Sequence, residues 1–129
     1  MTTSTLNKQR TAICVGNDDH IRSSVGLILR TAGYAVTETR TCAEARQALQ
    51  SETPAFVVLD INLPDGSGFE MVEAWRKDGH GALPVLFMSG SAPAQCQVRV
   101  ASLKSGFLLK PFNTLDLLAA IHTAIQVIA

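Results

Sequence analysis

Asp60, Ser89 and Lys110 each stand directly after a short apolar run of the sequence. A carboxylate can attack phosphorus as a nucleophile, an ammonium can neutralise phosphoryl oxygens, and a hydroxyl can donate a hydrogen bond to one of them. If the three apolar runs are parallel strands, their carboxyl ends meet at one edge of a sheet, where open α/β sheets bind ligands. The residue types therefore predict a phosphoryl-transfer site, provided that the chain forms such a sheet.

The first apolar run, residues 11–15, is also followed by polar residues, in the order Gly16, Asn17, Asp18 and Asp19. Its position at the same predicted edge adds carboxylates to the site. Asp19 has a simpler explanation as well, because an acidic residue suits the first turn of a helix.

The elements that must position these residues follow from hydrophobic periodicity. Short, nearly continuous apolar runs of the kind buried in parallel sheets predict strands at residues 11–15, 34–39, 56–59, 85–88 and 107–109. Helical patterns occupy residues 19–32, 41–50, 69–77, 94–103 and 113–128, with a capping box at Thr41 and Glu44 and a cap at Asn113. Five strands alternating with five helices predict an α/β fold, a doubly wound parallel sheet covered on both faces.

Composition excludes several classes of protein. The chain has 129 residues with 11 Lys and Arg against 11 Asp and Glu, so it lacks the strongly basic face typical of direct nucleic-acid binding. No apolar run approaches the length of about 20 residues that spans a bilayer. Residues 1–10 are polar and lack the apolar segment of a secretory signal, which predicts a loose tail before a domain at 11–129 in a cytoplasmic protein. The three cysteines form no CxxC pair and are expected to be small core thiols.

Three segments then carry a resemblance to a known family: LDINLPDGSG at 59–68, PVLFMSG at 84–90 and LKPF at 109–112. At nearly these spacings the chain resembles the receiver domains of two-component signalling. The resemblance implies a flavodoxin-like fold with strand order 2-1-3-4-5. It also implies that Asp60 is the phosphoacceptor, that Lys110 bonds the acyl phosphate, and that Ser89 is the switch hydroxyl. Phe107 occupies the position of the switch aromatic, and Pro111 follows a peptide bond that is typically cis in the family.

One position departs from the family. Receivers place two adjacent acidic residues after the first strand to hold Mg²⁺, and alignment on Arg22 puts Gly16 and Asn17 there. The ligands left for the metal are Asp60, the backbone carbonyl of Asn62, the amide of Asn17 and, directly or through water, Asp18. Because Mg²⁺ is usually held by one or two carboxylates plus waters, we expect a weakened magnesium site.

The resemblance implies a signalling switch phosphorylated on Asp60 by a partner histidine kinase or phosphotransfer protein. Such a protein catalyses only its own phosphorylation and dephosphorylation and is not an enzyme acting on a separate metabolite. The alternative is a pseudo-receiver, a protein-binding module that works without phosphorylation because Gly16 and Asn17 replace the acidic pair. A flavodoxin-like carrier is disfavoured because Asp18 and Asp19 would repel a phosphate. A dehalogenase-type phosphatase is disfavoured because Asn62 replaces its second carboxylate.

The last predicted helix has two apolar stripes. We expect its core face to carry Leu115, Leu118, His122 and Ile125, with His122 partly buried. A second stripe carries Leu117, Ala120, Ala124 and Val127 and is either a face for a partner or a second copy of the chain, or additional burial within the domain. The chain ends after this helix with no DNA-binding output domain, which leaves two alternatives, a stand-alone receiver or a piece of a longer protein such as a hybrid kinase. The polar start at residues 1–10 favours the stand-alone receiver.

Overall fold

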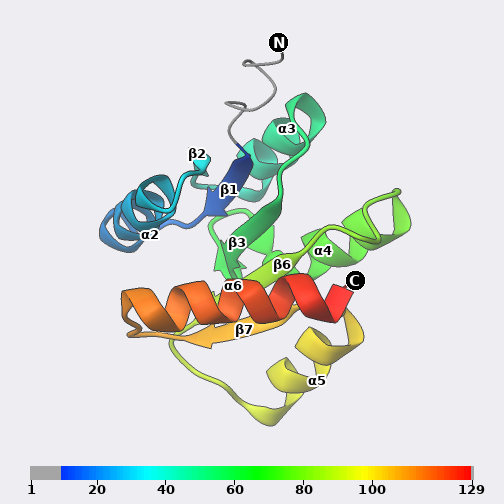
Figure 1. The fold of residues 1–129 in the computed structure, drawn as a ribbon. Coiled ribbons are helices and arrows are strands. Elements are labelled where there is room, and N and C mark those ends of the chain that lie inside the picture. Colours follow the sequence, from blue (N-terminus) through cyan, green and yellow to red (C-terminus); the bar gives the residue numbers. More distant parts are fainter. Residues whose placement is uncertain (1–9, 129) are drawn as a thin grey trace.

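A computed structural model describes residues 10–128, and one parallel sheet of five strands forms its centre (Figure 1). The strands are β1 (Thr11–Val15), β2 (Ala35–Thr39), β3 (Phe56–Asp60), β6 (Val85–Ser89) and β7 (Gly106–Leu109). They lie in the order β2-β1-β3-β6-β7. Counted along the chain, this is the order 2-1-3-4-5, so the doubly wound fold and its strand order are confirmed.

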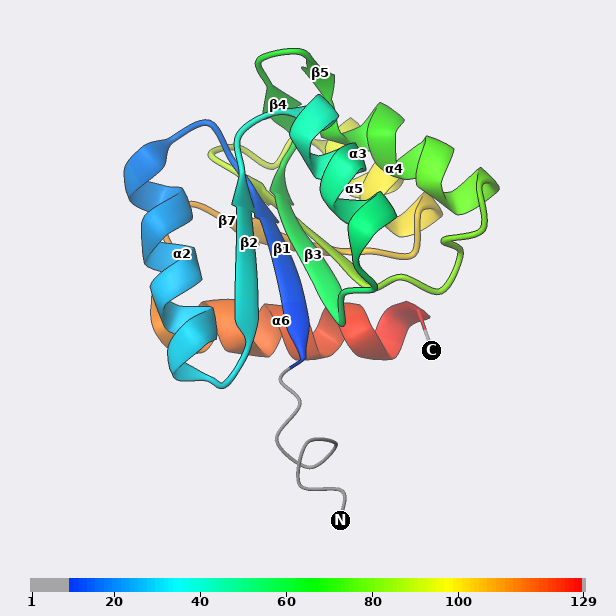
Figure 2. The same cartoon turned by 90° about the horizontal axis from the view of Figure 1, so that it is seen from above.

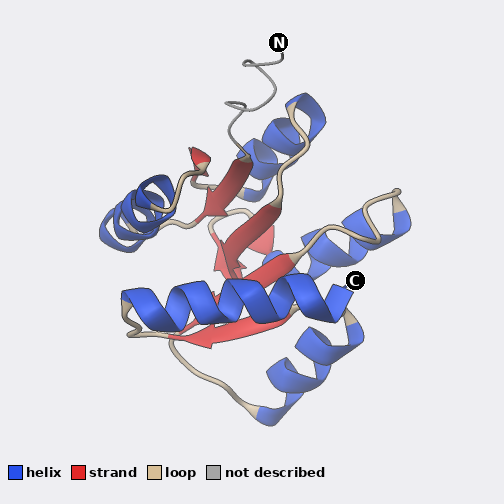
Figure 3. Cartoon of the chain, in the orientation of Figure 1, coloured by secondary structure: helices blue, strands red, loops and turns tan. Residues whose placement is uncertain are grey.

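Five helices cover the two faces of this sheet (Figures 2 and 3). They are α2 (Asp19–Thr31), α3 (Cys42–Ser51), α4 (Gly68–Lys77), α5 (Ala94–Ser102) and α6 (Thr114–Ile128). Helices α2 and α6 pack on one face, and α3, α4 and α5 pack on the other. Alternate residues of each strand serve the two cores: in β1, Ile13 and Val15 face α3–α5, whereas Ala12 and Cys14 face α2 and α6. Burial on both faces explains why the central strands are almost wholly apolar.

Local sequence signals fix where the helices begin. The Thr41 hydroxyl accepts a hydrogen bond from the backbone N–H of Glu44 at 3.1 Å, as the capping box predicts. The Glu44 carboxylate accepts from the N–H of Arg40, one residue before the expected partner, at 3.0 Å. Asn113 caps α6 by accepting from the N–H of Asp116 at 2.8 Å. Each cap satisfies a backbone donor that the first helical turn leaves free.

A small antiparallel ribbon follows β3 where only a loop was predicted. It pairs β4 (Asn62–Leu63) with β5 (Gly66–Ser67). Asp65, between the two strands, accepts hydrogen bonds from the backbone N–H groups of Cys42 at 2.7 Å and Ala43 at 3.0 Å. The ribbon is thereby tied to the N-terminus of α3. These two donors lower the pKa of the Asp65 carboxyl below its ordinary value of 3.8.

The predicted core face of the last helix is wrong for Leu115 and His122, whereas Ile125 does pack against the core. Leu117, Ile121 and Ala124 face the sheet and are buried, whereas Leu115 is 77% exposed and His122 is exposed. The stripe assigned to a partner is therefore partly core, and His122 is not a partly buried imidazole. Both stripes are apolar, so periodicity alone does not show which one packs on β6 and β7.

Two negative findings apply to residues 10–128. No helix there is long and apolar enough to cross a membrane. Cys14, Cys42 and Cys96 are all free; the first two are buried, and burial raises the pKa of the Cys14 thiol to about 12. The predicted N-terminal tail lies outside the described residues, except for Arg10.

Candidate functional site

Asp60 and Lys110 meet at the carboxyl edge of the sheet. Asp60 is the last residue of β3 and is 8% exposed, and Lys110 directly follows β7. The Lys110 Nζ lies 2.6 Å from Asp60 Oδ1. The contact is an ion pair by distance, although its angles are not those of a hydrogen bond and the buried Oδ1 accepts none. The nearly buried carboxylate of Asp60 is thus paired with the ammonium of Lys110, although β6 lies between β3 and β7 in the sheet.

Ser89 ends the strand that lies between those two. The backbone carbonyl of Ser89 accepts a hydrogen bond from the Lys110 N–H at 2.8 Å, which ties the start of the loop between β7 and α6 to β6. The Ser89 hydroxyl oxygen accepts from the N–H of Ser91 at 3.2 Å. The peptide bond between Lys110 and Pro111 is cis, as predicted from the resemblance. Asp60, Ser89 and Lys110 therefore come together at one edge of the sheet, as their positions after the strands predict.

Phe107, predicted as the switch aromatic, lies in β7 opposite Phe87 of β6. It is half-buried and packs against the core on the side of α3, α4 and α5. Phe107 is the aromatic residue of β7, the strand that pairs with β6.

The loop between β1 and α2 does not bring a cluster of carboxylates to Asp60. Gly16 is buried, and a Cβ built on it would lie 3.0 Å from Asp60 Oδ2. Asn17 and Asp18 are exposed. Asp18 is the N-cap of α2: its Oδ1 accepts from the N–H groups of His20 at 2.9 Å and Ile21 at 3.1 Å. The residue of this loop that lies against Asp60 is thus a glycine without a side chain.

Arg22 organises this loop, a role that sequence reasoning missed. Its guanidinium donates to the Gly16 carbonyl at 2.7 Å and to the Asp19 carboxylate at 2.7 Å, and its Nε lies 3.4 Å from Glu38 of β2. Arg40 adds a second cation, 3.2 Å from Asp19. Arg22 first and Arg40 second lower the pKa of Asp19. The only signal in the sequence was an arginine three residues after Asp19, one helical turn away.

Asn62, the predicted donor of a backbone carbonyl, lies in β4 with an exposed side chain. The start of α4 crosses close to Asp60: the Gly68 N–H donates to the Ile61 carbonyl at 2.6 Å. A Cβ at Gly68 would lie only 2.5 Å from the carbonyl oxygen of Asp60. Glycine is therefore required where the helix passes the end of β3.

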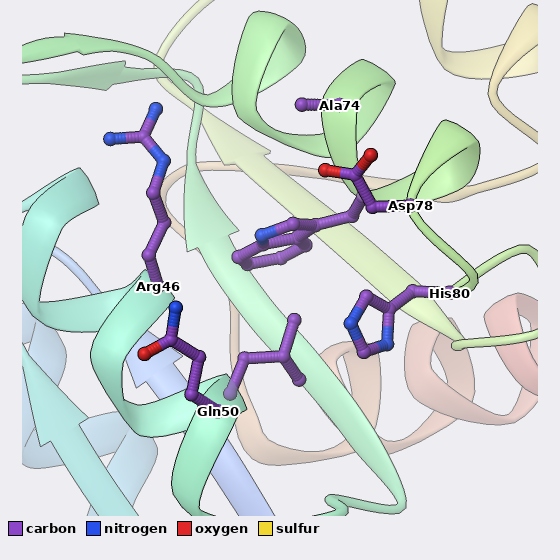
Figure 4. Close-up of a pocket in the computed structure, with 7 residues that line it drawn as sticks. Arg46, Gln50, Ala74, Asp78 and His80 are labelled. Carbon is purple, nitrogen blue, oxygen red and sulfur yellow. The ribbon is translucent and has the colours of Figure 1, made fainter.

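The hollows formed by residues 10–128 include two that differ in their place relative to the site. One of about 410 Å³ lies beside Lys110 and is lined by Ile21, Ser24, Lys110, Pro111 and Phe112. The other, of about 220 Å³, lies between α3 and α4 and shares no residue with the site (Figure 4). There Arg46 and Gln50 of α3 stand across from Asp78 and His80.

Comparison with known proteins agrees with this geometry. The sequence profile of the response regulator receiver domain matches residues 12–122. The transcriptional regulatory protein GltR of Pseudomonas aeruginosa is 31% identical over 121 residues, which are 91% of this chain and 49% of GltR. The chemotaxis protein CheY4 of Vibrio cholerae superposes with a TM-score of 0.83 at 26% identity, covering 90% of this chain and 98% of CheY4. The HemR receiver domain of Leptospira biflexa gives 0.81 at 30% identity, covering 91% and 94% of the two chains.

The chain spans about half the length of GltR, so these likenesses concern the receiver part of such regulators. The match covers the strands that carry Asp60, Ser89 and Lys110. The chain belongs to the response regulator receiver domain family.

Proposed function

We propose that the chain is a signalling switch in which Asp60 accepts a phosphoryl group from a partner histidine kinase or phosphotransfer protein. The observation that carries this proposal is the ion pair of Asp60 and Lys110, 2.6 Å apart at the carboxyl edge of the sheet, with Ser89 on the strand between them. Asp60 is only 8% exposed, so water does little to stabilise its charge, and the charge depends on the Lys110 ammonium instead.

The chemistry follows from the two carboxylate oxygens. Because Oδ1 is buried and faces Lys110, Oδ2 is the oxygen that attacks phosphorus. An O–P bond forms as the P–N bond of a phosphohistidine breaks, and the imidazole leaves as the neutral base after taking up a proton. Lys110 neutralises the charge on the phosphoryl oxygens, which is the main catalytic requirement of phosphoryl transfer. The Ser89 hydroxyl uses its oxygen as an acceptor in this structure, so its hydrogen is available for a phosphoryl oxygen.

The proposed switch begins with that hydroxyl. Movement of Ser89 toward the phosphoryl group frees space beside β7, and Phe107 turns inward from its half-buried position. The change reaches a partner-binding face through α5 and α6, which flank β7. On this proposal the chain catalyses only its own modification and acts on no separate metabolite.

Intact-mass spectrometry with a small phosphodonor, such as acetyl phosphate, tests the proposal. We expect a single phosphoryl adduct that is absent from Asp60→Ala and strongly reduced in Lys110→Ala. Asp78→Asn, which changes an exposed carboxylate at the end of α4, is the matched control and should be labelled as the wild type is. A folded protein that takes up no phosphoryl group, under conditions that label another receiver, would refute the proposal.

A second function is favoured by the loop after β1. Gly16 offers no side chain and Asp18 is held by the N-terminus of α2, so neither supplies a free carboxylate for a metal beside Asp60, and a binding module that needs no phosphorylation would not require one. The discriminating measurement is the affinity for a partner kinase. Equal affinity of the wild type and Asp60→Ala, with no labelling of either, supports the module.

We also propose self-association through α6. The stripe involved is the one with Leu115 and Leu118, not the one with Leu117 and Ala124, which is largely buried in the core. Leu115 is 77% exposed and stands near Leu118, which lines a groove between α2 and α6 together with Leu27. Sedimentation of wild type and Leu115→Ser tests it, with a loss of dimer expected in the variant. A cytoplasmic location and the absence of direct contact with nucleic acid or membrane, both expected from the sequence, stay part of the proposal.

A further inference from the structure

The donor set around Asp60 does not fit a magnesium ion. Mg²⁺ requires nearly octahedral oxygen ligands, usually one or two carboxylates completed by waters. Here Asp60 is the one carboxylate at the strand ends, and its Oδ1 already contacts the Lys110 ammonium at 2.6 Å. Gly16 has no donor in its side chain, and Asn17 offers a neutral amide. Within residues 10–128 no group of three His, Cys, Asp or Glu side chains could hold a metal ion.

Asp18, the acidic residue directly after Asn17, already has a structural role. Its Oδ1 accepts two backbone N–H groups of the first turn of α2, at 2.9 and 3.1 Å. Turning this carboxylate toward Asp60 would leave both donors without their partner, and loss of an N-cap destabilises the helix that it begins. The position of α2 therefore opposes recruitment of Asp18 by a cation.

The other nearby carboxylates are paired with arginines. Asp19 lies between Arg22 at 2.7 Å and Arg40 at 3.2 Å. Glu38 lies between Arg22 at 3.4 Å and Arg30 at 2.9 Å. The Arg22 side chain is only 11% exposed and also holds the Gly16 carbonyl, so this positive charge is fixed beneath the loop. A divalent cation would meet a guanidinium there instead of free carboxylates.

The carboxylates beside this loop already have partners without a metal. Asp19 and Glu38 pair with Arg22, Arg30 and Arg40, Asp60 pairs with Lys110, and Asp18 caps α2. A site that holds Mg²⁺ needs carboxylate oxygens that are free to bind it. We propose that this receiver works without a divalent cation at Asp60, because its own arginines and Lys110 balance the site. The proposal does not depend on whether Asp60 is phosphorylated.

The same geometry identifies the residue that would restore a cation site. Asn17 is exposed, and Asn17→Asp changes an amide for a carboxylate of nearly the same shape. Gly16→Asp is a poorer choice, because its Cβ would stand 3.0 Å from Asp60 Oδ2. Asn17→Asp adds, next to Gly16, a carboxylate that the arginines and Lys110 do not balance, so this variant should gain the cation binding that the wild type lacks.

The experiment measures cation binding to the unphosphorylated, chelator-treated protein. Thermal unfolding and backbone amide NMR shifts are recorded during titration with MgCl₂, against KCl at the same ionic strength. We expect no saturable shift of the amides of residues 16–19 and 60–62 in the wild type or in Asn17→Ala, the matched control. In Asn17→Asp we expect a saturable shift of these amides and a melting temperature raised by about 5 °C at ten times the dissociation constant.

Saturable, site-specific shifts in the wild type would overturn the proposal, whatever the outcome of the labelling experiment. Failure of Asn17→Asp to gain binding would also overturn it, because the absent carboxylate would then not be what excludes the cation. If Asp60 is labelled by a phosphodonor, the proposal further requires equal labelling of the wild type with Mg²⁺ and with a chelator. If the protein is not labelled but behaves as expected in the titration, the proposed phosphorylation is refuted and the inference about the cation stands.

Discussion

Gly68→Ala is the most direct test of how closely α4 passes the phosphoacceptor strand. The added Cβ would lie 2.5 Å from the carbonyl oxygen of Asp60 and 3.2 Å from that of Ile61. Real Cβ atoms essentially never approach another heavy atom within 3.0 Å, so the end of β3 or the start of α4 must move by at least 0.5 Å. Both partners are backbone, and neither can turn aside as a flexible side chain would.

Overpacking of this kind costs about 1–3 kcal/mol, and a clash of backbone with backbone belongs in the upper part of that range. With an unfolding entropy of about 2.1 cal/mol/K per residue, 2–3 kcal/mol lowers the melting temperature by roughly 8–12 °C. Because the moving group is the carbonyl of Asp60 itself, the rate of phosphoryl labelling should fall as well.

Thermal unfolding followed by circular dichroism measures the first effect. Gly81→Ala is the matched control, because a Cβ there would meet only the Arg76 carbonyl oxygen at 3.9 Å and Gly81 is exposed. This control should be neutral or slightly stabilising, by up to about 1 kcal/mol, since alanine restricts the unfolded chain. A Gly68→Ala protein that melts within about 2 °C of the wild type would refute the argument from close packing.

Two further predictions concern hydrogen-bonded side chains that hold other parts of the fold. Arg76 donates to the carbonyls of Leu103 at 3.0 Å, His80 at 2.8 Å and Leu83 at 2.7 Å, so Arg76→Met should cost about 2–4 kcal/mol in urea unfolding. Arg46→Met, an exposed change on α3, should cost less than about 0.5 kcal/mol, and an equal loss in both would contradict the role of the three carbonyls. For Asp65, the lowered pKa means that the charged form stabilises the fold above the ordinary pKa of 3.8 and that this is lost as the pH falls through the lowered pKa. The difference in melting temperature between wild type and Asp65→Asn should therefore be present at neutral pH and close in strong acid, and a gap independent of pH would show that the charge is irrelevant.

The fold was predictable because its strands are buried on both faces, which makes them short apolar runs separated by helical patterns. The strand order was not contained in those patterns and came only from the resemblance. The ribbon of β4 and β5 was missed because two-residue strands leave no periodicity. The face of α6 was assigned wrongly because Leu115 and Leu118 are as apolar as Leu117 and Ile121, and only the packing on β6 and β7 decides between them.

In the candidate site, too, some features could be predicted from the sequence and others could not. Asp60, Ser89 and Lys110 were predictable because residues after parallel strands share one edge of the sheet. The arginine pairs were not, because Glu38 lies 16 residues after Arg22 in sequence and the contact exists only once α2 packs against β2. The role of Asp18 as a cap was likewise hidden, since its sequence position suits a metal ligand and an N-cap equally well.

Gly16 bears on both proposed functions and on the inference about the cation. Loss of an acid at this position removes a metal ligand, but it also leaves Asp60 Oδ2 without a side chain beside it, since even a methyl group would lie 3.0 Å away. An oxygen uncovered in this way is more accessible to an incoming phosphorus, while Lys110 supplies the nearest positive charge. Loss of the cation and retention of a reactive carboxylate are therefore compatible, and Gly16 does not by itself argue for a binding module. What would argue for one is an Asp60 that stays unmodified although Oδ2 is open and Lys110 is in place.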